Sequence, residues 1–392
     1  MSRNQTKQSD HTAEAEGLAA SLQELLEGLV AMEQVRHAVV AVERGDGSFC
    51  WVGAQGEANP DGTPMQADTA YWIASVTKLY IASAIWKLYE QGRIAVDERM
   101  ATYLPAERIS GLHRMSDGVD RTDEITLRHL LGHSSGLPDY LEERPEGGKS
   151  LFDQIFEQGD RSWSLDEAME IVRDRLTPYF VPQPLHAEKK KIRYSDTNYQ
   201  LLIAIIEAVT GQPLHAVFAE MFYQPLGLKQ TFHPGNSPAE PVGPLATVWH
   251  EDDPLDIPLA MQSFRDLYST IDDQLAFMRA LVQDQVFEDP ATLGLMMSDW
   301  NTFPFSLNPA PLSPKWPIAY GLGMMRLAMP RLFTPFRPIP PVVGHTGVSG
   351  SWLFYCEELD TFLAGTVDQM TAGAVPFRFI PRLVGVLAAS FR

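Results

Sequence analysis

Strand-like segments lie at both ends of this chain and helix-like segments fill most of the middle, and this order constrains the fold more than any other feature. Residues 37–43 and 48–54 are apolar runs joined by an Asp46-Gly47 turn, which predicts a hairpin. Near the other end, tight links separate three strand-like runs, at 342–347, 351–357 and 361–368. The economical arrangement is one antiparallel sheet built from both chain ends, flanked by helices and carrying an inserted, mostly helical lobe. This is a mixed α/β (α+β) fold.

Helical spacing of apolar residues predicts the other elements. An amphipathic helix is expected over residues 13–35, a strong helix from Ser75 to a stop at Gly92, and a last helix over 376–390. Further helical signals lie at 127–131, 165–175, 198–209, 214–221 and 272–282. Residues 301–341 are rich in proline and predict an irregular connection with edge-like pieces. We therefore expect one lobe from residues 1–95 and 320–392, a second from 96–319, and a site in the cleft between them.

Composition limits the classes of partner. The 392 residues are 45% hydrophobic and 21% charged, as in ordinary globular proteins, and are too many for one simple core. The formal net charge of −19 repels phosphate backbones and anionic lipid, which argues against nucleic acid and membrane surfaces as partners. The N-terminal segment is polar and the longest aliphatic runs are too short to span a bilayer, so a cytoplasmic location is expected. The sequence carries no indication of oligomeric state.

Two cysteines, Cys50 and Cys356, are too few for a disulfide framework. Both stand in aromatic, strand-like runs, and we expect both to be buried free thiols. The histidines show no spacing typical of metal ligands, so neither a metal nor a cofactor is expected.

A serine and a lysine stand three residues apart where the strong helix is expected to begin. At this spacing the side chains of Ser75 and Lys78 share one helix face. A serine hydroxyl becomes a good nucleophile only when a neighbouring base takes its proton, and a lysine with a lowered pKa can be that base. The helix N-terminus adds a positive field and free N–H groups that suit a developing oxyanion. Alone, this short motif is most simply a helix cap beside a solvated lysine.

Two further motifs follow in the chain. Tyr194-Ser195-Asp196 precedes a predicted helix, and a tyrosine phenol beside a cation can relay a proton. His345-Thr346-Gly347 enters a predicted strand, whose backbone N–H groups can face an oxyanion while glycine admits a substrate closely. Each motif in isolation is more simply a polar turn, but the three in this order are unlikely to arise by chance.

Ser-x-x-Lys, Tyr-x-Asn (here Tyr-x-Asp) and His-x-Gly, in this order, resemble the serine β-lactamase and penicillin-binding protein superfamily. The resemblance is greatest to the branch that holds class C β-lactamases, DD-peptidases and family VIII carboxylesterases. It extends over nearly the whole chain, through YWIASVTKLYIASAIWKLYEQGRI, ITLRHLLGHSSGLPDY, YSDTNYQLLIAIIEAVTGQPL and GHTGVSGSW. It implies a β-lactamase/transpeptidase-like fold.

The resemblance also implies a role for each matching residue. Ser75 would be the acylated nucleophile, Lys78 a general base or proton shuttle, and Tyr194 a proton relay. The backbone N–H groups of Ser75 and Val348 would form the oxyanion hole. His345 would contact Tyr194 or the substrate. Asp196, Thr346 and Gly347 would line the substrate site.

Two residues depart from the pattern of that branch. Asp196 stands where the branch has Asn. A carboxylate near Lys78 favours the ammonium form of the lysine, so Tyr194 becomes the more favoured candidate for the base. Asp196 also suits an amine-bearing substrate. His345 stands where many relatives have Lys, and a mostly neutral imidazole holds a substrate carboxylate less firmly. Efficient β-lactam turnover is therefore less expected.

The sequence thus favours a serine hydrolase that splits esters or small amides through a Ser75 acyl-enzyme, with a small molecule as its partner. The alternative is a D-alanyl-D-alanine carboxypeptidase or a β-lactamase-like penicillin-binding enzyme. A second alternative, based on Asp196 alone, is a ligand-binding homologue with low activity.

A competing motif must be weighed against Ser75. Residues 132–136 (GHSSG) match the Gly-x-Ser-x-Gly nucleophile elbow of α/β-hydrolases, with Ser134 as the nucleophile. That elbow needs a strand before the serine and a helix after it. Here a helical pattern precedes Ser134 and Pro138 follows it, so Ser134 is predicted to be structural.

Overall fold

The computed structural model describes residues 2–236, 243–305 and 314–391, and burial from residue 15 onward. Its largest sheet has eight antiparallel strands in the order β2-β1-β12-β11-β10-β9-β8-β7. The strands are β1 (His37–Arg44), β2 (Cys50–Gly56), β3 (Tyr71–Ala74), β4 (Trp249–His250), β5 (Asp253–Pro254), β6 (Leu267–Ser269), β7 (Asn301–Thr302), β8 (Ile318–Tyr320), β9 (Met325–Leu327), β10 (Val342–Thr346), β11 (Trp352–Cys356) and β12 (Thr361–Thr366). Two small sheets pair β3 with β6 and β4 with β5.

The large sheet joins the two ends of the chain. β1 pairs on one side with β2, through Val39 and Ala54, and on the other with β12, through Val39 and Thr366. Every residue of β12 is buried, as is most of β1, because helices cover both faces of the sheet. This confirms the predicted antiparallel sheet from both chain ends and the mixed α/β (α+β) class.

The described residues also form helices. They are α1 (Ser2–Val30), α2 (Thr77–Glu90), α3 (Ala106–Ile109), α4 (Leu127–Leu131), α5 (Leu151–Gln158), α6 (Leu165–Arg175), α7 (Asp196–Thr210), α8 (Leu214–Phe218), α9 (Gln224–Leu226), α10 (Pro258–Phe264), α11 (Ile271–Val282), α12 (Ala291–Met296) and α13 (Val375–Ser390). Short 3-10 turns lie at Met100–Thr102, Thr122–Glu124, Glu357–Leu359 and Met370–Ala372, and a π-helical turn at Ala219–Tyr223 joins α8 to α9. Ser164 and Thr270 cap α6 and α11, and Gly211 ends α7 in the left-handed conformation.

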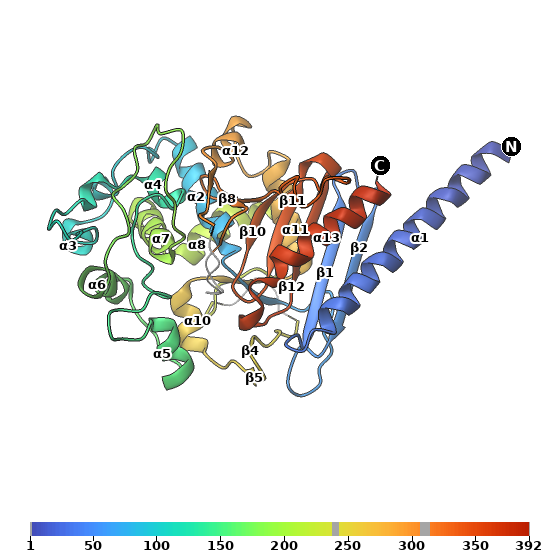
Figure 1. Cartoon of the computed structure of the whole chain (residues 1–392), viewed down its shortest axis with the longest axis horizontal. Helices are drawn as coiled ribbons and strands as arrows, with labels where there is room; N and C mark the ends of the chain where they lie inside the picture. Colours follow the sequence, from blue (N-terminus) through green and yellow to red (C-terminus); the bar gives the residue numbers. More distant parts are fainter. Residues whose placement is uncertain (1, 237–242, 306–313, 392) are drawn as a thin grey trace.

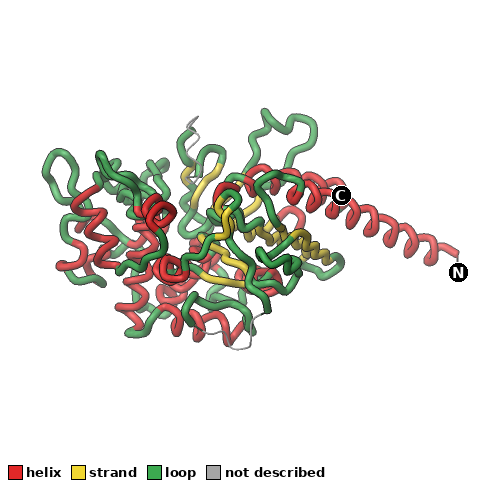
Figure 2. Tube along the Cα trace, turned by 90° about the horizontal axis from the view of Figure 1, so that it is seen from below, coloured by secondary structure: helices red, strands yellow, loops and turns green. Residues whose placement is uncertain are grey.

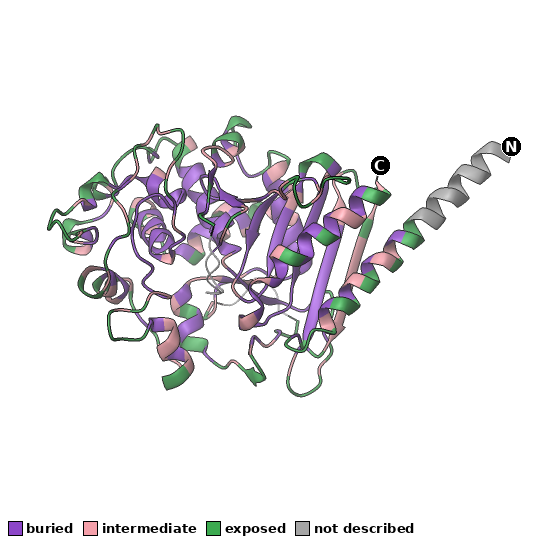
Figure 3. Ribbon diagram, viewed as in Figure 1, coloured by how far each residue is buried: buried purple, intermediate pink, exposed green. Residues whose placement is uncertain are grey.

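Some helices pack on the large sheet, and others group beside it. α1 and α13 pack together over one face of the sheet, while α11 packs against β1, β11 and β12 (Figure 1). The helices between residues 106 and 226 group beside the strands (Figure 2). The strands at the centre of the sheet are buried, and the exposed residues concentrate on the outer helices and loops (Figure 3).

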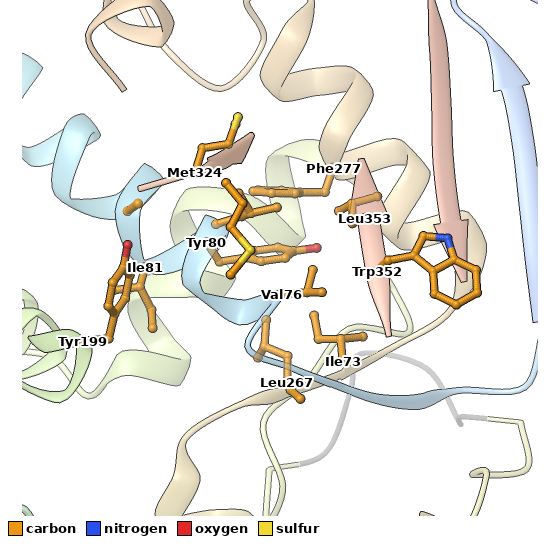
Figure 4. Close-up of a cluster of buried hydrophobic side chains, with 14 of the residues drawn as sticks. Ile73, Val76, Tyr80, Ile81, Tyr199, Leu267, Phe277, Met324, Trp352 and Leu353 are labelled. Atoms are coloured by element: carbon orange, nitrogen blue, oxygen red, sulfur yellow. The ribbon is translucent and has the colours of Figure 1, made fainter. Parts of the chain in front are cut away.

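Two central helices pack against each other. α2 is buried along most of its length, and Figure 4 shows Tyr80 and the preceding Val76 near Phe277 of α11 and Leu353 of β11, and Ile81 beside Tyr199 of α7. α7 is buried from Thr197 to Ile206 and packs against α2. The first turns of α2 and α7 meet, because the first carries Lys78 and the second carries its ion-pair partner Asp196.

Most predicted elements are confirmed, and three predictions need correction. The first helix begins earlier and ends earlier than residues 13–35, since α1 spans Ser2–Val30. Within the proline-rich stretch, β7, β8 and β9 join the main sheet, so the sheet extends further than the connection predicted there; residues 306–313 lie outside the described residues. Cys356 is buried, but Cys50 is exposed because it begins the edge strand β2; both thiols are free.

Among the described residues, no single helix is long and apolar enough to cross a bilayer. α7 and the 214–226 segment pass the same length and composition test only when taken together as a pair bent by 77°.

Candidate active site

Ser75 lies in a sharp turn between β3 and α2. The turn is made by Ala74, which adopts a left-handed backbone with φ of 47°, uncommon for a residue with a side chain. The helix begins at Thr77 rather than at Ser75 as predicted, and the carbonyl oxygen of Ser75 accepts a hydrogen bond from the Lys78 N–H (3.0 Å). Because the chain turns sharply here, Ser75, which precedes the buried helix α2 in the sequence, lines the cleft.

The side chains of Ser75, Lys78 and Asp196 form a hydrogen-bonded row. The ammonium of Lys78 lies 2.8 Å from Ser75 Oγ. On its other side, the same ammonium pairs with the carboxylate of Asp196, at the first residue of α7. Lys78 is almost fully buried and Asp196 is 18% exposed, so the pair is shielded from water on the lysine side. The structure thus brings together three residues that were predicted from two separate motifs.

The surroundings of Lys78 keep it charged. Burial opposes an ammonium, but the negative charge of Asp196, together with Tyr194 and Asp266, outweighs burial and raises the pKa of Lys78 well above its usual range. Its nitrogen also lies 5.1 Å from the ring centre of Tyr194 and 5.4 Å from that of Tyr199, within cation–π range. Lys78 therefore holds a proton at neutral pH.

Tyr194 lines the cleft beside Ser75 and is 8% exposed. Its ring packs on that of His133, with ring centres 4.5 Å apart. Burial raises the pKa of Tyr194, and the charge of Lys78 and polar contacts with Ser75 and Lys78 only partly oppose this. The phenol is therefore neutral at rest and placed to donate a proton.

His345 is fully buried, and both of its ring nitrogens lie within hydrogen-bond distance of other groups of the protein. Its Nε2 lies 3.1 Å from the hydroxyl of Tyr320, and its Nδ1 lies 2.7 Å from the carbonyl oxygen of Thr346. Its ring centre is 6.2 Å from that of Tyr194. Burial and the charge of Lys78 lower the pKa of His345 to about 3. Both nitrogens are engaged within the protein, and the imidazole lies beside the Tyr194 ring, which is one of the two contacts expected of it; contact with a substrate stays a prediction.

Gly347 brings the Val348 backbone next to Ser75. A Cβ atom on Gly347 would lie 2.2 Å from Ser351 Oγ and 2.8 Å from the carbonyl oxygen of Ile73, so only glycine fits against the strand that leads to Ser75. Ser75 and Val348 line the same two hollows of the cleft, and Thr346 and Gly347 line one of them. Within the described part of the chain, neither the Ser75 N–H nor the Val348 N–H donates a hydrogen bond to another group of the backbone or a side chain.

Sequence reasoning missed two carboxyl groups in the cleft wall, Glu142 and Asp266. Both line the hollow that contains Ser75 and Lys78. Burial raises the pKa of Asp266 to about 7, and burial with the charges of Asp139 and Asp196 raises the pKa of Glu142 well above its usual range. Neither residue belongs to a motif, so no local signal could have found them. The described residues contain no group of three or more His, Cys, Asp or Glu placed to hold a metal ion.

The competing serine, Ser134, lies in a different setting. The short helix α4 precedes it, and an irregular loop follows. Gly136 has φ of 80°, and a Cβ there would lie 1.9 Å from the carbonyl oxygen of Phe180, so this glycine serves a close backbone contact. No strand precedes Ser134 and no helix follows it, which argues against a nucleophile elbow.

Comparison with known proteins shows the family of the chain. A family model described as Beta-lactamase matches residues 22–378, and the chain therefore belongs to the β-lactamase family. It is 31% identical over 245 residues to the esterase EstB of Burkholderia gladioli, covering 62% of this chain and 57% of EstB. It is 32% identical over 176 residues to a putative D-alanyl-D-alanine carboxypeptidase of Escherichia coli, covering 44% of this chain and 36% of that protein.

Among solved structures, the chain resembles a D-stereospecific amidohydrolase from Streptomyces sp., with a TM-score of 0.68 and 25% identity. The similarity covers 92% of this chain and 96% of that one. It confirms the β-lactamase/transpeptidase-like fold. The sequence alignments, by contrast, span little more than half of EstB and about a third of the carboxypeptidase.

Proposed function

We propose that this protein is a serine hydrolase that splits esters or small amides through an acyl-enzyme on Ser75. The observation that carries the proposal is the row formed by Ser75 Oγ, the Lys78 ammonium at 2.8 Å and the Asp196 carboxylate beyond it. The N–H groups of Ser75 and Val348, free of other partners in the described chain, are suited to an oxyanion hole. The names of the relatives, an esterase, a carboxypeptidase and an amidohydrolase, support acyl transfer.

The proton balance of the first step follows from the charges. As Ser75 Oγ bonds to the substrate carbonyl carbon, its proton passes to Lys78, and Lys78 passes one of its own protons to Asp196. The neutral Tyr194 phenol donates its proton to the leaving group and recovers one from Lys78. Water then attacks the acyl carbon and gives one proton to the Lys78–Asp196 pair, the ester bond to Ser75 breaks, and Ser75 Oγ takes up one proton from Lys78, which returns the row to its starting charges.

The cleft favours a cationic over an anionic substrate. The positive charge of Lys78 is matched by Asp196, and the nitrogens of His345 are engaged within the protein. Glu142 and Asp266 add carboxyl groups to the wall beside Ser75. A substrate ammonium would reduce the electrostatic repulsion between these carboxylates, whereas a substrate carboxylate would increase it. This disfavours the carboxypeptidase and β-lactamase alternatives, since both substrates carry a carboxylate.

Two p-nitrophenyl esters that differ by one ammonium test this preference. We expect kcat/KM for the alanine ester to exceed that for the propionate ester by about 10-fold, as one partly screened charge contact would give. Glu142→Gln should lower kcat/KM for the alanine ester and leave the propionate ester unchanged. Glu146→Gln, on an exposed part of the same loop, is the matched control. Equal use of both esters by the unaltered protein would contradict the preference.

Covalent labelling tests the proposed function itself. The protein is incubated with a p-nitrophenyl ester or a fluorescent penicillin, and the mass added to the peptide that contains Ser75 is measured. We expect rapid ester turnover and a transient acyl adduct, both lost in Ser75→Ala and both kept in Ser134→Ala. Persistent penicillin labelling with weak ester turnover would favour the penicillin-binding alternative, and absence of any adduct would favour the ligand-binding one. The cytoplasmic location stays a prediction that cell fractionation can check.

A further inference from the structure

Three buried side chains form a hydrogen-bonded chain behind the active site. The Tyr199 hydroxyl of α7 lies 2.9 Å from the Tyr320 hydroxyl of β8. The Tyr320 hydroxyl lies 3.1 Å from Nε2 of His345 on β10, and Nδ1 of His345 lies 2.7 Å from the carbonyl oxygen of Thr346. Tyr199 is 2% exposed, and Tyr320 and His345 are fully buried. This Tyr199–Tyr320–His345 chain crosses from the helical lobe to the sheet.

The chemistry of the acceptor at one end fixes the direction of every donor. The carbonyl oxygen of Thr346 can only accept, so Nδ1 of His345 carries the proton. In the neutral imidazole Nε2 is then an acceptor, and the Tyr320 hydroxyl donates to it. Tyr320 oxygen in turn accepts from Tyr199, whose hydroxyl is nearer to it than to the carbonyl oxygen of Leu131 at 3.3 Å. All donors point from α7 toward β10, so the bonds polarise one another in the same sense.

Each end of the Tyr199–Tyr320–His345 chain contacts a part of the proposed catalytic machinery. At the sheet end, the peptide between Thr346 and Gly347 is held on both sides, by His345 at its carbonyl and by the Ser351 carbonyl oxygen at its N–H (2.8 Å). The next residue is Val348, whose N–H is proposed for the oxyanion hole. At the helical end, Tyr199 lies one turn after Asp196, and its ring faces the Lys78 ammonium at 5.4 Å.

We propose that Tyr199 and Tyr320 are positioning residues whose hydroxyl groups fix the oxyanion hole through His345 and the Thr346–Gly347 peptide. The inference rests on the proposed function, because it assumes acyl transfer at Ser75. It assigns His345 a role within the protein in place of substrate contact. A displaced oxyanion donor weakens transition-state stabilisation without changing how the ground state binds.

Tyr→Phe substitutions isolate the hydroxyl groups. Tyr320→Phe leaves the ring packing in place but removes the donor to His345 Nε2, and Tyr199→Phe removes the donor to Tyr320. Tyr80 supplies a matched control, because it is fully buried on α2, its ring stacks on Phe277 with centres 3.6 Å apart, and its hydroxyl has no hydrogen-bond partner among the described residues (Figure 4). Tyr80→Phe therefore removes a buried hydroxyl that does not belong to the Tyr199–Tyr320–His345 chain.

The experiment measures kcat and KM for p-nitrophenyl acetate, with kcat expressed per active site titrated by a fluorophosphonate, so that loss of folded protein does not count. We expect Tyr199→Phe and Tyr320→Phe each to lower kcat about 10-fold with KM within about twofold, since complete loss of an oxyanion donor costs roughly 10²- to 10³-fold. The double variant should lose about as much as the larger single loss, because both hydroxyls act through one chain. Tyr80→Phe should match the unaltered protein.

Four outcomes would overturn the inference. Unchanged kcat per titrated site in both single variants would show that the hydroxyls do not position the site. Losses that multiply in the double variant, or an equal loss in Tyr80→Phe, would show that no common chain is involved. Failure of the fluorophosphonate to label Ser75 even in the unaltered protein would overturn the proposed function together with this inference, which separates the two failures.

Discussion

Lys78→Met should lower kcat/KM for a p-nitrophenyl ester by about 10⁴-fold, at the upper end of what general acid–base catalysis supplies. Methionine keeps the unbranched, apolar part of the side chain but removes the group that lies between Ser75 Oγ and the Asp196 carboxylate. The serine proton then has no carrier, and a partly buried carboxylate is left without its cation. Steady-state kinetics with active-site titration measures the loss.

Two companion variants make this result specific. Lys87→Met alters a lysine of the same helix whose ammonium binds the Val286 carbonyl oxygen away from the cleft, and it should leave kcat/KM unchanged. Asp196→Asn removes the charge that holds the pKa of Lys78 above its usual range, so that pKa falls. We expect kcat/KM to drop about 10²-fold at pH 7 and to recover as pH rises and Lys78 loses its proton. An increase at pH 7 would instead identify neutral Lys78 as the base.

Asp368→Ala should reduce the free energy of unfolding by about 3 kcal/mol, the cost of leaving buried polar partners without their acceptor. Asp368 follows β12, is fully buried, and lies 2.9 Å from His37 Nε2 and 2.9 Å from Thr366 Oγ1. Nδ1 of His37 donates to the Glu57 carbonyl oxygen, so Nε2 and Asp368 share one further proton. The pair ties the start of β1 to the end of its neighbour β12. The midpoint of urea unfolding measures the change.

Asp368→Asn provides the contrast. An Asn amide can donate to a neutral His37 and accept from Thr366, and Asn tolerates the left-handed backbone at this position, where φ is 43°. We therefore expect it to cost far less than Ala. Burial raises the pKa of Asp368, so the stability from its proton is lost as pH rises through that pKa, and Asn should remove this alkaline dependence. Asp252→Ala, in an exposed pair with Arg36, should have no measurable effect. Equal losses for Ala and Asn would show that the shared hydrogen bonds are unimportant.

Local patterns were sufficient to predict most of the fold. α4 and α6 have the bounds expected from apolar spacing, and the late strands β10, β11 and β12 fall within the three predicted runs. Pairing between β7, β8 and β9 was harder to predict, because these strands have two or three residues each and lie beside prolines. Cys50 shows the same limit: its apolar neighbours indicate a strand, but only the order of strands makes β2 an edge.

The residues of the site could be predicted only where they belong to a sequence motif. Ser75, Lys78, Tyr194 and Asp196 were found because their spacing is characteristic, and the structure brings them together. Glu142, Asp266 and Tyr320 come from three unrelated loops and strands, and their proximity depends on how the two lobes pack. The partner of His345 was missed for the same reason, since Tyr320 lies outside the three motifs used to define the site.

The pairing of Val39 with Thr366 has a consequence for synthesis on the ribosome. At roughly 5–20 residues per second, tens of seconds pass between the emergence of β1 and that of β12. During this time β1 has a hydrogen-bonding edge without its central partner, and such edges pair readily with other chains. Translation of an mRNA truncated before the codon for residue 361 would therefore yield an aggregation-prone fragment rather than a smaller working enzyme. The final strands thus determine whether the nascent chain can fold.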